Sequence, residues 1–394
     1  MELQCRLDRQ FEVSLFENFS THSLATHLAE FVGHHRALLV TTPTVARLYG
    51  EALRDTLISR NVDVSLHTLA ITEDDKTLPA VQSICQRSQE LHLNRHSALI
   101  ALGGGVCSDT VGFAASMIRR GISYVRVPTT LIGQVDAGVG LKCGVNFGDG
   151  KNYLGSFYPP LHVFVAPPFL RTLPAPGLRQ GLAEILKMAL IRDHLLFEIV
   201  DTHHAELLQS GFQQPAAIAL RVLRDAIRLM LAELQENPYE NLTLERLVDF
   251  GHTVSPTLET LSHYSLAHGD AVAIDMAFSC ALACELGYLH EAALERILRT
   301  LCAIGLPIAS ALLSADTVAA AFASTSLHRA GRLNLVVPTA IGAATWIRSM
   351  NQIPASAIAA ALSRIAQAQA ELAMPQPAPG YLVSATHTAS AHRG

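Results

Sequence analysis

The feature that most constrains the fold is a buried strand that runs directly into three glycines. Residues 97–102 read SALIAL, which is apolar enough for a strand covered on both faces. Gly103, Gly104 and Gly105 follow, and a helical pattern continues from Asp109. A strand, a glycine turn and a helix bring backbone N–H groups against a phosphate. Because the pattern is GGGxxxD rather than GxGxxG, a tight turn without a ligand is an equally good interpretation.

The first 160 residues alternate between short apolar strands and helices. Strands are expected at 37–41, 62–68, 97–102 and 124–127, with helices through 45–58 and 79–91. This alternation predicts an α/β domain with a mostly parallel, Rossmann-like sheet and helices on both faces.

The second half changes to Ala- and Leu-rich segments with a period of 3.6 residues. They lie at 178–209, 214–234, 242–261, 268–287, 290–303 and 355–372. We therefore predict an α/β domain over residues 1–166 and an all-α domain over 167–373, joined where Pro167-Pro168 stand. Residues 374–394 lack periodicity and predict a disordered tail.

Composition excludes several classes of protein. Of 394 residues, 49% are hydrophobic and 16% charged, which argues against disorder, and the net charge of -5 disfavours nucleic acid as a partner. The N-terminus carries acidic residues, unlike a signal peptide, and Asp275 and Glu285 interrupt the most apolar stretch, so no membrane span is expected. Seven cysteines without a CxxC pair fit a reducing cytoplasm.

Residues 121–160 are polar and glycine-rich within an otherwise apolar chain. A stretch of this length indicates a functional site, with a long surface loop as the alternative. The segments GGGVCSDTVGF, RRGISYVRVPTTLIGQVDAGVGLK and GKNYLGSFYPP resemble, in order and spacing, the signature segments of dehydroquinate synthases and related sugar phosphate cyclases. The resemblance covers roughly residues 10–350 and implies the same two-domain fold.

The resemblance also implies a metal site. The family's ligands fall on Glu184 in GLAEILK, His252 in DFGHTVSP and His268 in LAHGDAVAID. Spacing alone would not select these two from 18 histidines. One carboxylate and two imidazoles suit Zn²⁺ or Co²⁺ and leave positions open for substrate oxygens. Lys187 follows Glu184 by about one helical turn and should point to the same side.

Two further sets of residues are implied by the resemblance. Contacts to NAD⁺ fall on Glu73, Lys76, Gly104, Gly105, Val106, Asp109, Thr129, Thr130, Lys142, Lys151 and Thr172. Catalytic and substrate contacts fall on Lys142, Lys187, Asp136, Asn152, Lys151, Asp249 and Arg120. Arg120 matches an arginine that reaches into the neighbouring subunit, which implies a homodimer. One departure is Thr41-Thr42, where relatives commonly have an acidic residue for the adenine ribose.

Three positions bear on the substrate. Met230 and Pro256 stand where dehydroquinate synthases have a lysine and a histidine, and Asp249 replaces an asparagine. Fewer cations and one more carboxylate disfavour an acidic substrate and suit sedoheptulose 7-phosphate. Arg246, His328 and Arg329 are either phosphate contacts or surface cations.

The implied reaction is a carbon–oxygen lyase reaction that yields a C7 cyclitol, with 2-epi-5-epi-valiolone as the expected product. It proceeds through transient oxidation by NAD⁺, β-elimination of phosphate, re-reduction and intramolecular aldol closure. The alternatives are a 2-epi-valiolone or desmethyl-4-deoxygadusol synthase, a 3-dehydroquinate synthase, and an NAD- and metal-dependent polyol dehydrogenase.

Overall fold

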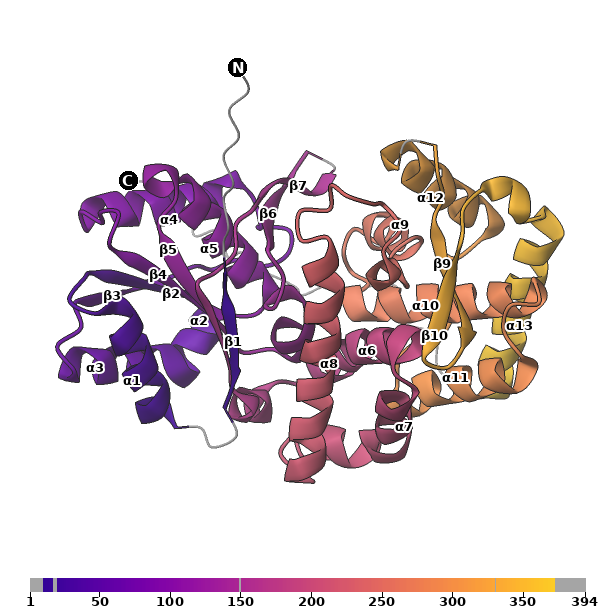
Figure 1. Ribbon diagram of the computed structural model, residues 1–394, viewed down its shortest axis with the longest axis horizontal. Helices are drawn as coiled ribbons and strands as arrows, with labels where there is room; N and C mark the ends of the chain where they lie inside the picture. The colour runs from indigo at the N-terminus through magenta and orange to yellow at the C-terminus, as the bar shows by residue number, and fades with distance from the viewer. Residues whose placement is uncertain (1–9, 17–19, 149, 330, 373–394) are drawn as a thin grey trace, which may run out of the picture.

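A computed structural model describes residues 10–16, 20–148, 150–329 and 331–372, and the predicted tail lies outside them. Figure 1 shows two lobes side by side. The N-terminal lobe contains a six-stranded sheet in which every neighbouring pair is parallel. Its order is β1-β8-β5-β4-β2-β3, with strands β1 (Glu12–Leu15), β2 (Ala37–Thr41), β3 (Val64–Thr68), β4 (Ala98–Gly103), β5 (Ser123–Pro128) and β8 (His162–Val165).

Helices cover both faces of this sheet, which explains why its strands are almost continuously apolar. Leu39 of β2 packs in the core formed with α1 (Thr21–Val32) and α3 (Glu51–Ser59). Leu38 and Val40 pack in a separate core with α4 (Leu78–Glu90) and α5 (Gly105–Met117). Short helical segments complete the lobe, namely α2 (Pro43–Val45), η1 (Ala46–Gly50), η2 (Ile118–Arg120) and η4 (Pro167–Thr172).

The polar, glycine-rich stretch folds into a helical turn and a hairpin near the junction of the lobes (Figure 1). The turn is η3 (Gly133–Ala137), and the hairpin pairs β6 (Lys142–Phe147) with β7 (Gly150–Phe157) in antiparallel register. A Cβ on Gly155 would lie 2.4 Å from the Cys143 carbonyl oxygen, so the strands approach too closely for any side chain there. The stretch is thus an ordered scaffold, not a long surface loop.

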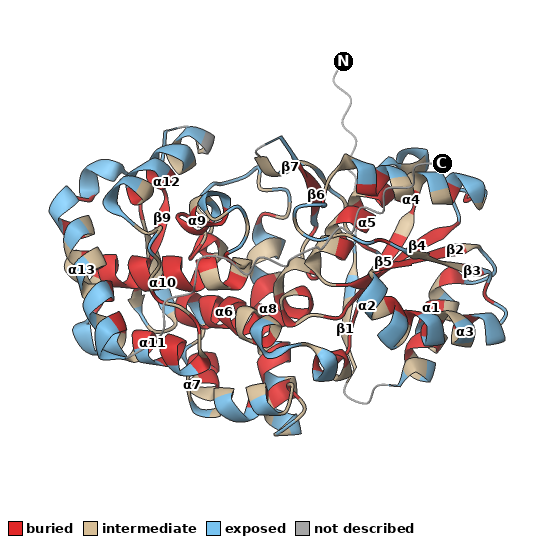
Figure 2. Ribbon diagram, turned by 180° about the vertical axis from the view of Figure 1, so that it is seen from behind, coloured by how far each residue is buried: buried red, intermediate tan, exposed pale blue. Residues whose placement is uncertain are grey.

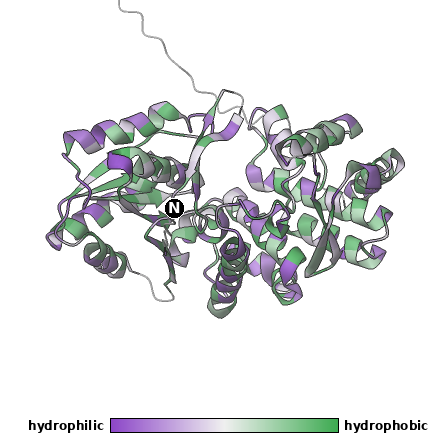
Figure 3. Cartoon of the chain, turned by 45° about the horizontal axis from the view of Figure 1, so that its top comes forward, coloured by the Kyte–Doolittle hydropathy of each residue, from purple (hydrophilic) through white to green (hydrophobic). Residues whose placement is uncertain are grey.

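The C-terminal lobe is helical around α10, which is buried along most of its length (Figure 2). On the outer helices, hydrophilic and hydrophobic residues alternate around the axis (Figure 3). The predicted fold class is confirmed, with one addition: an antiparallel ribbon of β9 (Leu335–Ala340) and β10 (Ala343–Ile347). The helices are α6 (Ala175–Arg192), α7 (His194–Gln209), α8 (Ala216–Glu236), α9 (Ser255–Leu261), α10 (His268–Glu285), α11 (Glu291–Ile304), α12 (Ala315–His328) and α13 (Ala355–Glu371), with short turns η5 (Leu247–Asp249) and η6 (Met350–Gln352).

Two predicted helices differ from the observed ones. The segment 178–209 is divided at Asp193, whose carboxylate accepts the Leu195 backbone N–H at 3.0 Å and caps a new helix. The segment 242–261 is an α-helix only from Ser255 onward, and residues before it form irregular structure beside the site. Among the described residues, no helix is long and apolar enough to cross a membrane.

Candidate active site

Three ligand-type side chains converge in the C-terminal lobe. Glu184 lies inside α6 and is 1% exposed, His268 is the first residue of α10, and His252 follows η5. One ligand atom from each lies within 4.8 Å of the others. The Glu184 Oε1 atom is 3.2 Å from His268 Nε2 and 3.8 Å from His252 Nε2. We call these three residues the metal triad.

The outer nitrogens of both imidazoles are already bonded. His252 Nδ1 lies 3.0 Å from the Phe250 carbonyl oxygen, and His268 Nδ1 lies 3.0 Å from Glu259 Oε1. These contacts favour the tautomer in which Nδ1 carries the proton and the Nε2 lone pair faces Glu184. Both Glu184 carboxylate oxygens are buried; Oε2 pairs with the Lys187 ammonium, and Oε1 has no hydrogen bond from any described residue. A divalent cation fits this donor set and would satisfy Oε1.

Lys187 joins the triad to the other lobe. Its buried ammonium nitrogen lies 2.7 Å from Glu184 Oε2 and 3.4 Å from Oδ1 of Asp136, which belongs to η3. Burial alone would lower the Lys187 pKa, but Asp136 and then Glu184 outweigh it and raise the pKa above its ordinary value. The two carboxylates therefore favour the charged form of Lys187 at the junction of the lobes.

Glu259, on α9, is a site residue that the sequence analysis missed. Its carboxylate contacts both His268 and the Lys151 ammonium, so it connects the triad to strand β7. Burial opposes ionisation of Glu259, yet its hydrogen bond with His268 and the charge of Lys151 outweigh burial and lower its pKa. Nothing in the local sequence around Glu259 indicates this role.

Asp275 was also missed, although a signal existed. This fully buried carboxylate on α10 accepts the backbone N–H groups of Thr253, Val254 and Ser255 at 2.8, 2.6 and 2.9 Å. It fixes the segment that follows His252 and the start of α9. An acidic residue inside an apolar helix must find buried partners, which is the signal that the sequence offered.

The glycine turn, Gly103–Gly105, lies against the segment after β5. Thr129 donates its backbone N–H to the Gly103 carbonyl at 3.0 Å, and a Cβ on Gly104 would lie 2.9 Å from Thr130 Cγ2. Gly104 caps α5, whose first turn, including Val106, presents N–H groups without helical acceptors. The buried Glu73 Oε1 atom has no hydrogen-bond partner among the described residues. A nucleotide fits both features, because its phosphate would meet free N–H groups and its ribose hydroxyls could donate to Glu73.

Other predicted nucleotide contacts are drawn together by the hairpin. The buried Lys76 ammonium pairs with Asp109 and donates to Asn152 Oδ1 at 2.7 Å. Asn152 has a left-handed backbone with φ of 51°, held by its N–H bond to Asn146 Oδ1 at 2.8 Å. These contacts link the start of α5, the turn before α4 and β7 in one network.

Two predicted contacts, Thr172 and Arg120, and the departure at Thr41 lie outside these clusters. The Thr172 hydroxyl lies 2.6 Å from that of Tyr49. Thr41 is buried and donates to the Leu102 carbonyl at 2.7 Å, so its hydroxyl is already used. Arg120 is exposed and has a left-handed φ of 68°. Its role toward a second subunit stays a prediction.

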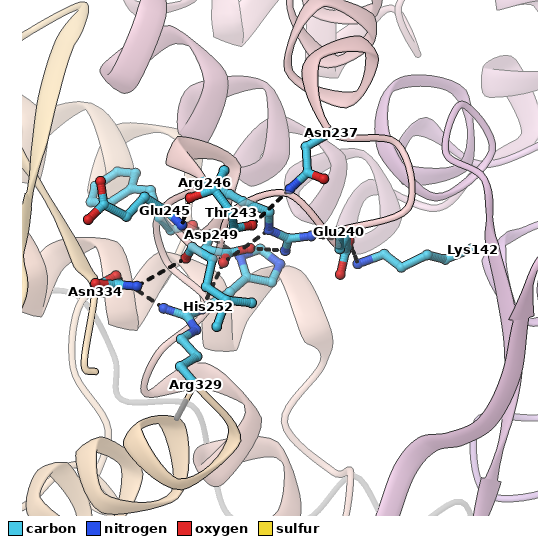
Figure 4. A network of polar contacts seen from close by, with 12 residues as sticks. Lys142, Asn237, Glu240, Thr243, Glu245, Arg246, Asp249, His252, Arg329 and Asn334 are labelled. Carbon is cyan, nitrogen blue, oxygen red and sulfur yellow. Dashed lines mark hydrogen bonds and ion pairs between the residues drawn. The ribbon is translucent and has the colours of Figure 1, made fainter. Parts of the chain in front are cut away.

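A second group of charges, the cation cluster, lies beside His252 (Figure 4). Its members are Lys142, Glu240, Arg246, Asp249 and Arg329. The buried Asp249 carboxylate pairs with Arg246 and with Arg329 Nη2 at 2.7 Å, and Glu240 pairs with Arg246 and with Lys142 Nζ at 2.7 Å. Burial would raise the Asp249 pKa, but Arg246 and then Arg329 outweigh it and lower the pKa.

Four further positions were related to the substrate by the sequence. Met230 is buried in α8 at 3% exposure, and Pro256 is the second residue of α9. The His328 side chain is outside the described part of the chain. Arg329 is an internal ion-pair partner of Asp249, so it is more than a surface cation.

Arg126 on β5 holds the loop between η3 and β6. Its fully buried guanidinium donates to the carbonyls of Ala137, Gly138 and Gly140 at 3.2, 3.2 and 2.6 Å, and to that of Lys142 at 3.0 Å. Among the described residues no carboxylate pairs with it. These carbonyl dipoles therefore offset the buried charge, and the loop that joins Asp136 in η3 to Lys142 in β6 is fixed in shape.

Comparisons with known proteins identify the family to which the chain belongs. The family model of the 3-dehydroquinate synthase N-terminal region matches residues 66–180, and that of the C-terminal region matches residues 181–325. The chain therefore belongs to the dehydroquinate synthase superfamily, and it is an enzyme of the sugar phosphate cyclase family.

Within that family, the chain is similar to 2-epi-5-epi-valiolone synthases. It is 43% identical over 343 residues to the enzyme of Streptomyces glaucescens, covering 86% of this chain and 87% of the relative. The solved structure of the 2-epi-5-epi-valiolone synthase of Streptomyces hygroscopicus subsp. jinggangensis, with NAD⁺ and Zn²⁺ bound, superposes with a TM-score of 0.87 at 39% identity, covering 93% and 99% of the two chains. A 3-dehydroquinate synthase of Thermoanaerobacter is 35% identical over 321 residues, or 80% and 88% of the two chains.

Proposed function

We propose that this enzyme converts sedoheptulose 7-phosphate into a C7 cyclitol, 2-epi-5-epi-valiolone, with release of phosphate, and so acts as a carbon–oxygen lyase. The observation that carries the proposal is the Asp249 carboxylate, which is buried between Arg246 and Arg329 beside the metal triad. Because Asp249 occupies both arginines, they have fewer free donors for a carboxylate on the substrate, and the site suits a neutral ketose head. The 43% identity to a 2-epi-5-epi-valiolone synthase supports this product.

We further propose that the enzyme uses NAD⁺ and Zn²⁺, or Co²⁺ in its place. The metal would be held by Glu184, His252 and His268, and the nucleotide by the glycine turn and Glu73. When bound, the nucleotide would take a hydride from the sugar and return it, and the metal would polarise a sugar oxygen. The solved relative with NAD⁺ and Zn²⁺ supports this cofactor set.

The side chains of this chain have roles that follow from their charge. Lys187, held as a cation by Asp136 and Glu184, would donate hydrogen bonds to substrate oxygens at the junction of the lobes. Lys142 and the arginines of the cation cluster would lower the cost of the negative charge on the departing phosphate.

The subunit organisation is also a proposal. We place the domain boundary between residues 166 and 167, directly after the sheet ends at Val165. We propose a homodimer in which Arg120 reaches the partner's site. The exposure of Arg120 and its left-handed backbone support a role in contact with another molecule.

A parallel turnover experiment tests the function. The purified protein is incubated with NAD⁺ and Zn²⁺, and either sedoheptulose 7-phosphate or the seven-carbon acid phosphate used by dehydroquinate synthase. We expect phosphate release from the ketose phosphate alone, no accumulation of NADH, and a cyclitol identified by NMR. Turnover of the acid alone would make the protein a dehydroquinate synthase, and accumulation of NADH would indicate a polyol dehydrogenase.

A further inference from the structure

Glu240 connects two cations that belong to different lobes. Its Oε1 atom lies 2.7 Å from the Lys142 ammonium of strand β6, and it also pairs with the Arg246 guanidinium before η5. Figure 4 shows Lys142 reaching from the N-terminal lobe toward this carboxylate, with Asp249 and His252 close behind Arg246. The Glu240 side chain is 24% exposed and lies on the solvent-accessible side of the cation cluster.

The backbone around Glu240 is arranged to present this side chain. Glu240 has a left-handed φ of 54°, a conformation that residues with a Cβ rarely adopt without support. Asn237 supplies that support: its carbonyl accepts the Glu240 N–H at 3.1 Å, and its buried side chain bonds the Thr243 carbonyl at 2.8 Å and the Leu242 N–H at 3.0 Å. Backbone strain held by specific bonds is typical of functional positions.

The cation cluster contains more positive than negative side chains. Lys142, Arg246 and Arg329 are three cations, and Glu240 and Asp249 are two carboxylates, so one positive charge is left. Asp249 is buried between two arginines and cannot leave them. Glu240 faces the Lys142 side chain, which is 60% exposed, so Glu240 is the carboxylate that an incoming anion meets.

We propose that Glu240 is a specificity-determining residue that limits the substrate to one strongly anionic group. Its carboxylate repels every anion that approaches Lys142 and Arg246, and the repulsion grows with the charge of that anion. A ligand with one phosphate is still attracted by the unmatched cation, whereas a second anionic group on the ligand is penalised. The inference rests on the proposed function only in assigning the phosphate of the substrate to this cluster.

Two small probes that differ in a single carboxylate test the proposal. Glycerol 3-phosphate carries a phosphate alone, and 3-phosphoglycerate carries a phosphate and a carboxylate. Dissociation constants for both are measured by calorimetry on the full-length protein loaded with NAD⁺ and Zn²⁺. We expect the wild type to prefer glycerol 3-phosphate, and Glu240→Gln to reduce that preference by about tenfold because 3-phosphoglycerate binds more tightly.

Matched variants separate charge from structure. Glu245→Gln removes the same charge five residues away, where Glu245 pairs with exposed Arg348, and should leave the preference unchanged. Glu240→Asp keeps the charge and should keep the preference. If Glu240→Gln folds poorly, Glu240→Gly removes the charge while relieving the left-handed backbone, and the same tenfold change is expected.

The outcomes are distinguishable from failure of the proposed function. An unchanged preference in both Glu240→Gln and Glu240→Gly overturns this inference, even if the wild type turns over sedoheptulose 7-phosphate. A changed preference in an enzyme that does not turn over that sugar would sustain the role of Glu240 and overturn the proposed substrate.

Discussion

The two lobes build their ligand sites in opposite ways. The glycine turn of the N-terminal lobe uses the backbone of three consecutive residues, Gly103–Gly105, at the end of one strand. The metal triad uses side chains from α6, the segment after η5 and the first turn of α10. A backbone site depends on close approach and on the absence of side chains, whereas a side-chain site depends on the residues that orient each ligand. The two sites should therefore fail differently when mutated.

The largest effect is expected from Glu184→Ala. Removing the only carboxylate of the triad should abolish metal retention and lower phosphate release by at least about a thousandfold. Metal content after dialysis and turnover are measured together. NAD⁺ affinity should stay near that of the wild type because the glycine turn is in the other lobe. Retention of both bound metal and activity would show that the triad is misassigned.

A smaller loss of metal affinity is expected from Glu259→Gln, because Glu259 contacts the triad residue His268 and is not itself a ligand. The variant keeps a hydrogen-bond acceptor for His268 but loses the charge that orients it and pairs with Lys151. Metal affinity should fall by about 10- to 100-fold, as is usual when a partner of a metal ligand is altered. Competition with a chelator measures the change. Unaltered metal affinity would mean that Glu259 serves only to fix Lys151.

The glycine turn is tested by Gly104→Ala. Gly104 has an ordinary extended backbone, so the cost is purely steric: the new Cβ would meet Thr130 Cγ2 at 2.9 Å. We expect NAD⁺ affinity to fall by about tenfold with metal content unchanged. The double variant Gly104→Ala/Thr130→Ser removes the clashing methyl group and should recover part of the loss, whereas no recovery would place the cause outside this contact.

The smallest effect is expected from Thr42→Asp. Thr42 directly follows β2, whose carboxyl end lies in register with Leu102 just before the glycine turn. An acidic residue at such a strand end accepts ribose hydroxyls in dinucleotide-binding folds. NAD⁺ should bind about three- to tenfold more tightly, as one added hydrogen bond gives. A fluorescence titration measures the NAD⁺ affinity of the variant. Weaker binding would mean that the ribose does not lie beside residue 42.

The same contrast explains what the sequence could predict. The glycine turn is contiguous, so the order of strand, glycines and helix indicates both the parallel sheet and a nucleotide site. The residues of the metal triad are far apart in the sequence, from Glu184 to His268, and no local pattern marks them. Only the family resemblance selected His252 and His268, and the structure brings them together with Glu184.

The residues that were missed are charged side chains whose partners lie on distant elements. Glu240, Glu259 and Arg126 look like ordinary charged residues in the sequence, and their partners lie on other elements. Asp275 is the exception, because a carboxylate within an apolar helix already required buried donors. The ribbon β9–β10 was not anticipated because it consists of two short strands within a half of the chain that is dominated by helical periodicity.

The hydrogen bonds from Arg126 to backbone carbonyls bear on the order in which parts of the site can form during synthesis. Its carbonyl partners follow it by only 11 to 16 residues, so all of them leave the ribosome soon after β5. Glu184, the first metal ligand, is synthesised later. Because lobes of a growing chain fold from the N-terminus onward, the loop carrying Asp136 and Lys142 can take its shape before any metal ligand exists. The N-terminal part of the site can therefore form before the residues of the metal triad are synthesised.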